Sequence, residues 1–178
     1  MSIVVIAGAA AGPFAAACVV LAFAGTTKLR RPAGTQPAAA ALNLPTAPAA
    51  VRTLGAVEVV VAVAGLAAGG VAAAAVAVVF AALAIAAWRL FVRSPGTACG
   101  CLGSSDAPVS ATHIVVNIAA AIAAALAAGA RSPLTAVGGN VWPRVAFVLL
   151  VGCGAWLVAT VLEVSPTLNA AMRQGGSG

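Results

Sequence analysis

The chain alternates between long apolar stretches and short stretches that hold its prolines, glycine pairs and charged residues. A helix that crosses the hydrocarbon core of a bilayer needs about 20 apolar residues, within a range of about 17 to 25. Five stretches meet this requirement, and we predict membrane spans over residues 3–27, 51–68, 71–92, 109–128 and 141–163. The predicted fold class is therefore all-α, a polytopic membrane helical bundle. We expect one domain over residues 1–170 and a flexible tail over 171–178.

The connections between the predicted spans fit this arrangement. The basic cluster at 28–32 ends the first span at the membrane surface, where cationic side chains anchor helices. Prolines in the next loop bracket a short apolar piece, 38–44, which is too short to span and is predicted to lie on the surface as a half-helix. The glycine pair at 69–70 permits a tight reversal, and Ser110 is suited to be the N-cap of the fourth span.

Composition supports a membrane protein and argues against nucleic-acid binding. Of the 178 residues, 63% are hydrophobic and 7% are charged, and the mean hydropathy is +1.13. A soluble domain carries about 25% charged residues. The net charge of +6 comes from basic residues at the ends of apolar segments, where they act as membrane anchors. The bilayer is thus the first predicted partner, and no nucleic acid is expected.

The distribution of positive charge predicts an orientation. Five spans place the two termini on opposite faces, and the cluster at 28–31 then shares a face with the loop that follows the third span. That face carries seven basic residues and the other carries two, which by the positive-inside rule predicts a cytoplasmic loop. The seven are Lys28, Arg30, Arg31, Arg52, Arg89, Arg93 and Arg173, and the two are Arg131 and Arg144.

The loop between the third and fourth spans contains the motif Cys99-Gly100-Cys101-Leu102-Gly103. A disulfide between two such near neighbours closes a small ring whose geometry departs from that of a relaxed bridge. Strained disulfides are more oxidising and more easily reduced, which suits a bond that is exchanged. The alternative is that both cysteines pack as small apolar residues. Turn-forming residues on both sides of the motif favour an exposed loop and thiol chemistry.

Glu58 lies inside the second predicted span, and an ionisable group at that depth is a functional candidate by default. One interpretation is an ion pair with Lys28 or Arg52 that holds helices together. The other is a role in carrying protons. Both interpretations stay open from the sequence.

His113 and Asn117 are four residues apart, so they share one face of the fourth span directly after the cysteine loop. A neutral imidazole within reach would take the proton from Cys99 or Cys101, and an imidazolium would lower the thiol pKa. The alternative for His113 is a histidine that only satisfies the helix start. For Asn117 we expect a hydrogen bond across helices.

Cys18 and Cys153 lie near the middle of the first and fifth predicted spans. They are either inert small residues or, if those helices touch, a buried pair that exchanges with the loop dithiol. Such a relay requires the two Cα atoms to come within about 7 Å of each other.

The order of these features resembles the MauE family of methylamine-utilisation membrane proteins, within the broader DoxX-like group. The resemblance covers roughly residues 16–126 and implies a redox-associated protein of the bacterial cytoplasmic membrane that works beside a thioredoxin-like partner. It implies that this partner is extracytoplasmic and that the cysteine loop faces outward, whereas the charge count predicts a cytoplasmic loop, so the face of the loop stays open. It rests on Gly25-Thr26-Thr27-Lys28-Leu29, Leu42-Asn43-Leu44-Pro45, Glu58 in a span that ends in glycines, Cys99-Gly100-Cys101-Leu102-Gly103, and the stretch from His113 to Asn117.

Three functions remain open at this point. The first is a thiol–disulfide oxidoreductase that cycles Cys99 and Cys101 between dithiol and disulfide. The second is soft-metal handling, with Cys99, Cys101 and His113 as ligands and Asp106 or water as a fourth. The third is a non-catalytic membrane subunit in which the two cysteines form a structural clip. The sequence contains no haem-ligating pair or nucleotide motif, and a quinone would require a lipid-side pocket.

Overall fold

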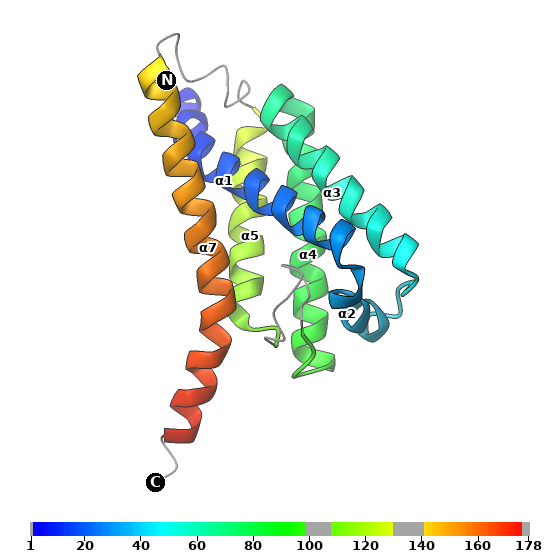
Figure 1. The fold of residues 1–178 in the computed structure, drawn as a ribbon. Coiled ribbons are helices and arrows are strands. Elements are labelled where there is room, and N and C mark those ends of the chain that lie inside the picture. Colours follow the sequence, from blue (N-terminus) through cyan, green and yellow to red (C-terminus); the bar gives the residue numbers. More distant parts are fainter. Residues whose placement is uncertain (1, 99–107, 130–140, 176–178) are drawn as a thin grey trace.

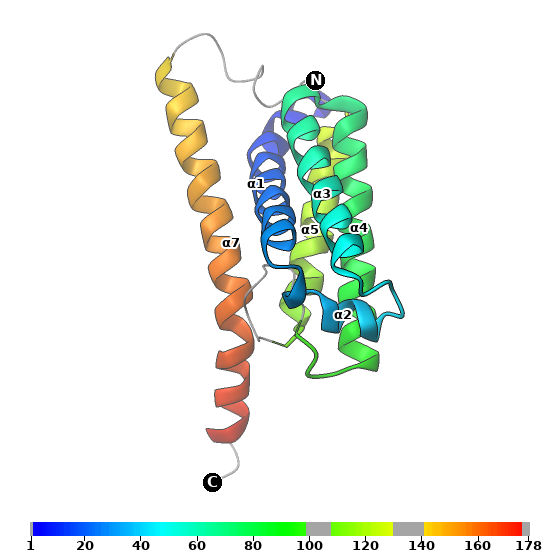
Figure 2. The ribbon, with the colours of Figure 1, turned by 45° about the vertical axis from the view of Figure 1, so that its right-hand side comes forward.

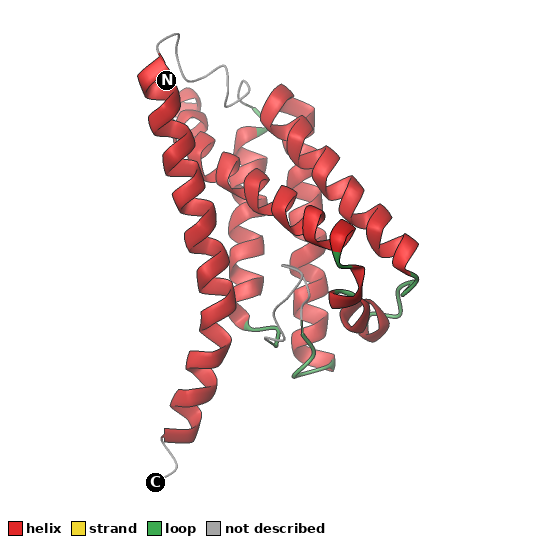
Figure 3. Cartoon of the chain, viewed as in Figure 1, coloured by secondary structure: helices red, strands yellow, loops and turns green. Residues whose placement is uncertain are grey.

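The computed structural model describes residues 2–98, 108–129 and 141–175, and nearly all of them are helical (Figure 3). Long helices stand side by side and run alternately up and down, with a short helix at one end (Figure 1). The predicted all-α bundle is therefore confirmed. In chain order the elements are α1 (Ser2–Arg30), η1 (Pro32–Gly34), α2 (Gln36–Ala41), α3 (Pro48–Ala68), α4 (Gly70–Arg93), α5 (Ala111–Ala127) and α7 (Val141–Gly175).

Four helices of the described chain are long and apolar enough to cross a membrane. These candidate spans are Ala10–Arg30, Pro48–Ala68, Gly70–Arg93 and Val145–Leu162. The fifth predicted span is α5, an apolar helix of 17 residues, at the lower end of the length that a bilayer requires. Each predicted span is thus a helix, and α5 is the shortest of the five.

The end of α7 differs from the prediction. The helix continues to Gly175, twelve residues beyond the predicted end at residue 163, so residues 171–175 of the expected flexible tail are helical. Residues 176–178 lie outside the described part. The helix passes Pro166, which removes one backbone hydrogen bond, and continues through the helix formers Leu168, Ala170, Ala171 and Met172.

The two ends of the bundle differ in what they carry. Helices α1 and α4 finish, and α3 and α5 begin, at the end where α2 lies, whereas the N-terminus lies at the opposite end (Figures 1 and 2). The basic end of α1 and the connection from α4 to α5 therefore share one end, as the sequence predicted. A tight turn joins α3 to α4 at the other end, where Gly69 and Gly70 have φ angles of 62° and 52° that favour glycine.

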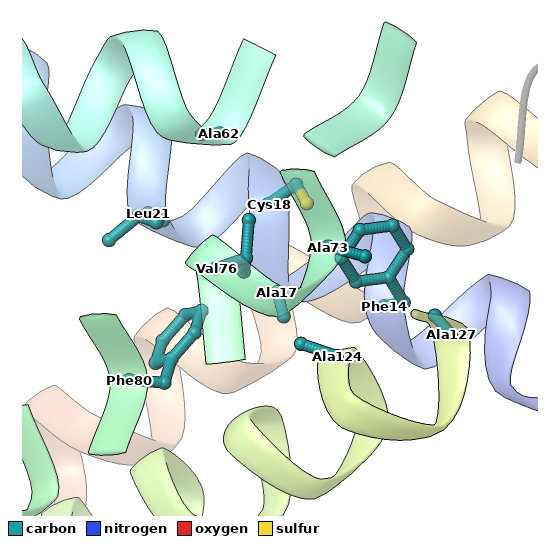
Figure 4. Packing of buried hydrophobic residues seen from close by; sticks show 10 residues of the cluster. All are labelled: Phe14, Ala17, Cys18, Leu21, Ala62, Ala73, Val76, Phe80, Ala124 and Ala127. Atoms are coloured by element: carbon teal, nitrogen blue, oxygen red, sulfur yellow. The ribbon is translucent and has the colours of Figure 1, made fainter. Parts of the chain in front are cut away.

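The core of the bundle is built from four helices and consists mainly of small side chains. Cys18 and Phe14 of α1 lie in it beside Val76 of α4, and alanines of α3, α4 and α5 close the remaining space (Figure 4). Small residues let membrane helices approach closely, which maximises dispersion contacts where lipid provides no hydrophobic driving force. The cluster consists of Phe14, Ala17, Cys18, Leu21, Ala62, Ala73, Val76, Phe80, Ala124 and Ala127.

Helix α2 ends in a defined cap. Its last turn is closed by hydrogen bonds from the Leu44 amide to the Ala39 carbonyl (2.9 Å) and from the Asn43 amide to the Ala40 carbonyl (3.0 Å). Asn43 has a φ of 57°, the left-handed conformation in which asparagine often stands in for glycine after a helix. Pro45 follows and cannot continue the helix. The predicted short helix is present, and it begins two residues before the predicted piece 38–44 and ends three residues before its end.

Helix α7 stands apart from the four-helix core and packs mainly on α1 (Figure 2). The contact is apolar: Leu162 of α7 is buried against Ala24 of α1, with Val116 of α5 beside them.

Candidate functional site

The cysteine motif lies outside the described residues, but the structure describes both ends of the segment that carries it. Ala98 and Pro108 face each other in an isolated antiparallel bridge. The Val109 amide donates a hydrogen bond to the Thr97 carbonyl at 3.1 Å, and the Thr97 amide donates to the Ser94 carbonyl. The described residues on either side of 99–107 therefore meet at one place on the bundle. We call residues 94–98 and 108–110 the loop stem.

The loop stem is packed against α2. Val109 is buried in an apolar cluster with Ala38 of α2, and with Ala87 and Leu90 from the last turns of α4. This packing fixes the stem on the helices at the end of the bundle where the basic cluster of α1 lies. The half-helix that sequence analysis treated as a surface feature thus supports the base of the cysteine loop.

His113 lies in the first turn of α5 and is buried, with 6% of its surface exposed. It forms a capping box with Ser110: the backbone N–H of Ser110 donates to His113 Nδ1 at 3.3 Å, and Ser110 Oγ lies 3.0 Å from the same nitrogen. A ring nitrogen that accepts a hydrogen bond carries no proton, so the neutral imidazole carries its proton on Nε2. The prediction that Ser110 is the N-cap is confirmed.

This geometry changes the chemistry available to His113. The lone pair that a general base would use is on Nδ1, and it already accepts from Ser110. The remaining ring nitrogen, Nε2, presents an N–H donor. A donor stabilises a thiolate by hydrogen bonding to its charged form.

Within the part of the chain that the structure describes, the hydrogen bond of Asn117 is made inside α5 and not across helices as we expected. The Asn117 Nδ2 donates to the backbone carbonyl of His113 at 2.8 Å, within α5. The expectation was wrong because a side-chain amide four residues along a helix reaches the carbonyl one turn earlier as readily as a neighbouring helix.

The ion-pair interpretation of Glu58 is confirmed, and its partner is Lys28. Lys28 Nζ lies 2.7 Å from Glu58 Oε2 and 3.0 Å from Oε1, and the two side chains are only 2% and 1% exposed. Arg52, the other predicted partner, is exposed on α3. Lys28 and Glu58 therefore form a buried ion pair between α1 and α3.

The pair lies where the backbones of α1 and α3 cross at two glycines. A Cβ atom on Gly25 would lie 2.5 Å from the Gly55 carbonyl oxygen, and a Cβ on Gly55 would lie 2.6 Å from the Gly25 carbonyl oxygen. A Cβ on Gly55 would also meet Lys28 Cβ at 2.9 Å. Both contacts with carbonyl oxygens are shorter than any side chain tolerates, so only glycine at both positions allows this approach. The close approach brings Lys28 and Glu58 within bonding distance.

The predicted relay through Cys18 and Cys153 does not appear in the structure. Both are free thiols: Cys18 is fully buried in the four-helix core, and Cys153 is exposed on α7. The Cys18 sulfur faces Gly65 of α3, since a Cβ on that glycine would lie 3.3 Å from it (Figure 4 shows the thiol among core residues). Of the two alternatives, the structure shows two unpaired cysteines, because Cys18 points into the core and α7 packs outside it.

The described residues contain no group of three His, Cys, Asp or Glu side chains that would hold a metal ion. The metal set considered from the sequence falls largely on Cys99, Cys101 and Asp106, which lie outside the described residues.

A comparison of the amino-acid sequence with models of protein families gives a match. The sequence model of the methylamine utilisation protein MauE family matches residues 5–131, which is 127 of the 178 residues and includes α1 to α5. This chain belongs to the MauE family. Helix α7 follows the matched region in the sequence of this MauE-family chain, and it contributes no residue to the four-helix core cluster described above. No curated protein and no solved structure matches the chain.

Sequence analysis of this MauE-family chain missed the two crossing glycines. The signal was present as a repeated spacing: Gly25 precedes Lys28 by three residues, and Gly55 precedes Glu58 by three. Residues three apart share a helix face, so a glycine and a charge at this spacing on each helix indicate a close crossing with an ion pair beside it.

Proposed function

We propose that this integral membrane protein is a thiol–disulfide oxidoreductase in which Cys99 and Cys101 cycle between dithiol and disulfide. The observation that carries the proposal is the loop stem. The bridge between Ala98 and Pro108 brings together the two described residues that flank the cysteine segment, which supports a thiol site at this end of the bundle. Membership in the MauE family supports the proposal through the redox association that the resemblance implies.

The proposed exchange moves two electrons and two protons. A thiolate from one of the two cysteines attacks a sulfur of a partner disulfide, and a mixed disulfide forms while one partner thiolate leaves. The second cysteine attacks the mixed disulfide, which closes the Cys99–Cys101 bond and releases the second partner thiol. The partner is thereby reduced to its dithiol and this protein is oxidised. The reverse sequence forms a disulfide in the partner.

His113 is proposed to assist this exchange as a hydrogen-bond donor. The anchoring of Nδ1 by Ser110 supports a fixed ring that offers Nε2–H near the loop stem. A donor beside a sulfur favours the thiolate, the form that attacks disulfides. This role replaces the general-base role considered from the sequence.

The proposed partner is a thioredoxin-like protein, and the proposed location is the bacterial cytoplasmic membrane, both from the family resemblance. The structure modifies the charge count that underlies the orientation. Because Lys28 is paired with Glu58 inside the bundle, it contributes no free charge to the surface. Removing it from the count leaves six basic residues against two, which still favours a cytoplasmic loop.

The test is a redox titration of the purified protein against glutathione, with the dithiol state measured by alkylation. Cys99→Ser and Cys101→Ser should each abolish exchange without preventing membrane insertion. Cys153→Ser, which changes an exposed thiol on α7, should leave exchange intact and serves as the matched control. Full activity in either loop variant would refute the two-thiol mechanism. Stoichiometric bound metal would favour metal handling, and a disulfide that reductants leave untouched would favour a structural clip.

A further inference from the structure

An apolar groove of about 650 Å³ lies between α4 and α5. Its walls include Val78, Ile85 and Trp88 of α4, and Ile118 and Ile122 of α5, and these side chains are largely exposed. Every lining residue is apolar, and the single polar group among them is the indole N–H of Trp88. Helix α7 packs on α1 rather than on this side, so the groove faces the lipid of the membrane (Figure 2).

The groove has the length of one membrane leaflet. Its lining runs from Ala77 to Trp88 along α4 and from Ile114 to Ala125 along α5. Eleven residue steps of helix measure about 16 Å. This is roughly half of the 30 Å hydrocarbon core, which is the depth that an acyl chain of one leaflet occupies.

One end of the groove lies at the arginine-rich end of the bundle. Arg89 directly follows Trp88 and lies four residues after Ile85, so it flanks the face of α4 that lines the groove. Among the side chains that the structure describes, Glu58 is the one carboxylate, and it is paired with Lys28. The exposed charges that the structure describes at this end are therefore all positive. They are those of Arg30, Arg31, Arg52, Arg89 and Arg93.

We infer that the groove between α4 and α5 binds one acyl chain of an anionic phospholipid, with the lipid phosphate held by Arg89. Basic sites beside grooves between membrane helices recognise anionic lipid head groups in this way. The lining offers a single hydrogen-bond donor, the indole N–H of Trp88, and is otherwise apolar, which favours an acyl chain over a quinone with two carbonyl groups to satisfy. The inference does not depend on the thiol chemistry proposed above.

The test compares two lipids that share their acyl chains and differ in the net charge of their head groups. Purified protein in dodecyl maltoside is titrated with phosphatidylglycerol and with phosphatidylcholine of identical acyl chains, and bound lipid is counted by native mass spectrometry. Phosphatidylglycerol should bind about fivefold more tightly, the effect of one arginine near a membrane surface. Arg89→Gln should remove this preference. Ile118→Trp, which fills the groove, should weaken the binding of both lipids.

Matched controls separate a site from general surface charge. Arg52→Gln removes an exposed arginine at the same end on α3, and Val60→Trp adds bulk to an exposed position of α3; neither should change lipid binding. Equal binding of the two lipids by the wild-type protein would overturn the inference, as would an equal loss in Arg52→Gln and Arg89→Gln. If Ile118→Trp changed the oligomeric mass in light scattering and left lipid binding intact, the groove would be an interface between copies instead.

Discussion

Removing one partner of the Lys28–Glu58 pair should destabilise the protein strongly, and removing both should not. Glu58→Gln keeps the shape of the side chain but leaves a buried ammonium group without a counter-charge. Lys28→Met leaves a buried carboxylate. Because both side chains are almost wholly excluded from solvent, neither lone charge can recover its hydration by a small movement.

The magnitude follows from this burial. Loss of one partner from a buried pair costs about 3–5 kcal/mol, whereas replacement of the whole pair by apolar side chains is close to neutral. We therefore expect a loss of at least about 3 kcal/mol of unfolding free energy in each single variant. The double variant Lys28→Met/Glu58→Leu should lie within about 1 kcal/mol of the wild type. Arg52→Met, at an exposed position on α3, should change stability by less than about 0.5 kcal/mol.

The assay is reversible unfolding in mixed micelles of dodecyl maltoside and SDS, followed by circular dichroism, with thiol exchange measured on the same samples. Single variants that each lose less than about 1 kcal/mol would contradict the view that burial dominates the energetics of the pair. The exchange measurement then separates two roles of Glu58. A pair that only joins helices predicts normal exchange in the double variant, whereas a proton-carrying Glu58 predicts normal stability with lost exchange.

Two further predictions concern the loop. His113→Asn can keep the hydrogen bond to the Ser110 amide but loses the Nε2–H donor. This variant should slow thiol exchange by up to about 30-fold at pH 7, because an unassisted thiol of pKa about 8.5 is only about 3% ionised there. The defect should fall below about twofold above pH 9, where the thiol ionises unaided; a defect independent of pH would indicate a structural histidine. Cys99 and Cys101 should resist a membrane-impermeant maleimide in whole cells and react after permeabilisation, and strong labelling from outside would reverse the predicted orientation.

The helices were predictable because a membrane span leaves a strong local signal, a long apolar run with polar ends. The start of α5 was also predictable from a local signal, since Ser110 carries the side chain that an N-cap requires. The end of α7 was not predictable in this way, because the apolar run stops near residue 163 while the helix continues past Pro166 to Gly175. Hydropathy reports where a helix leaves the lipid and does not report how far the helix continues beyond it.

The contacts of the polar residues were predictable only in part, because they depend on how helices cross. Sequence reasoning reduced the partners of Glu58 to Lys28 and Arg52 and could not choose between them. The crossing of α1 and α3 at Gly25 and Gly55 selects Lys28 as the partner, since it brings together the two helix faces that carry Lys28 and Glu58. The packing of Cys18 against Gly65 depends on the same kind of information, which no single helix contains.

These contacts connect the ion pair to the cysteine loop through the chain itself. Lys28 fixes the end of α1, and after a short connection α2 packs through Ala38 onto Val109 of the loop stem. Val109 in turn donates the hydrogen bond that closes the stem on Thr97. A break at the ion pair therefore frees the segment that supports the stem, and exchange at the loop should weaken in proportion to the lost stability. The double apolar variant, which restores the crossing without any charge, should restore the stem as well.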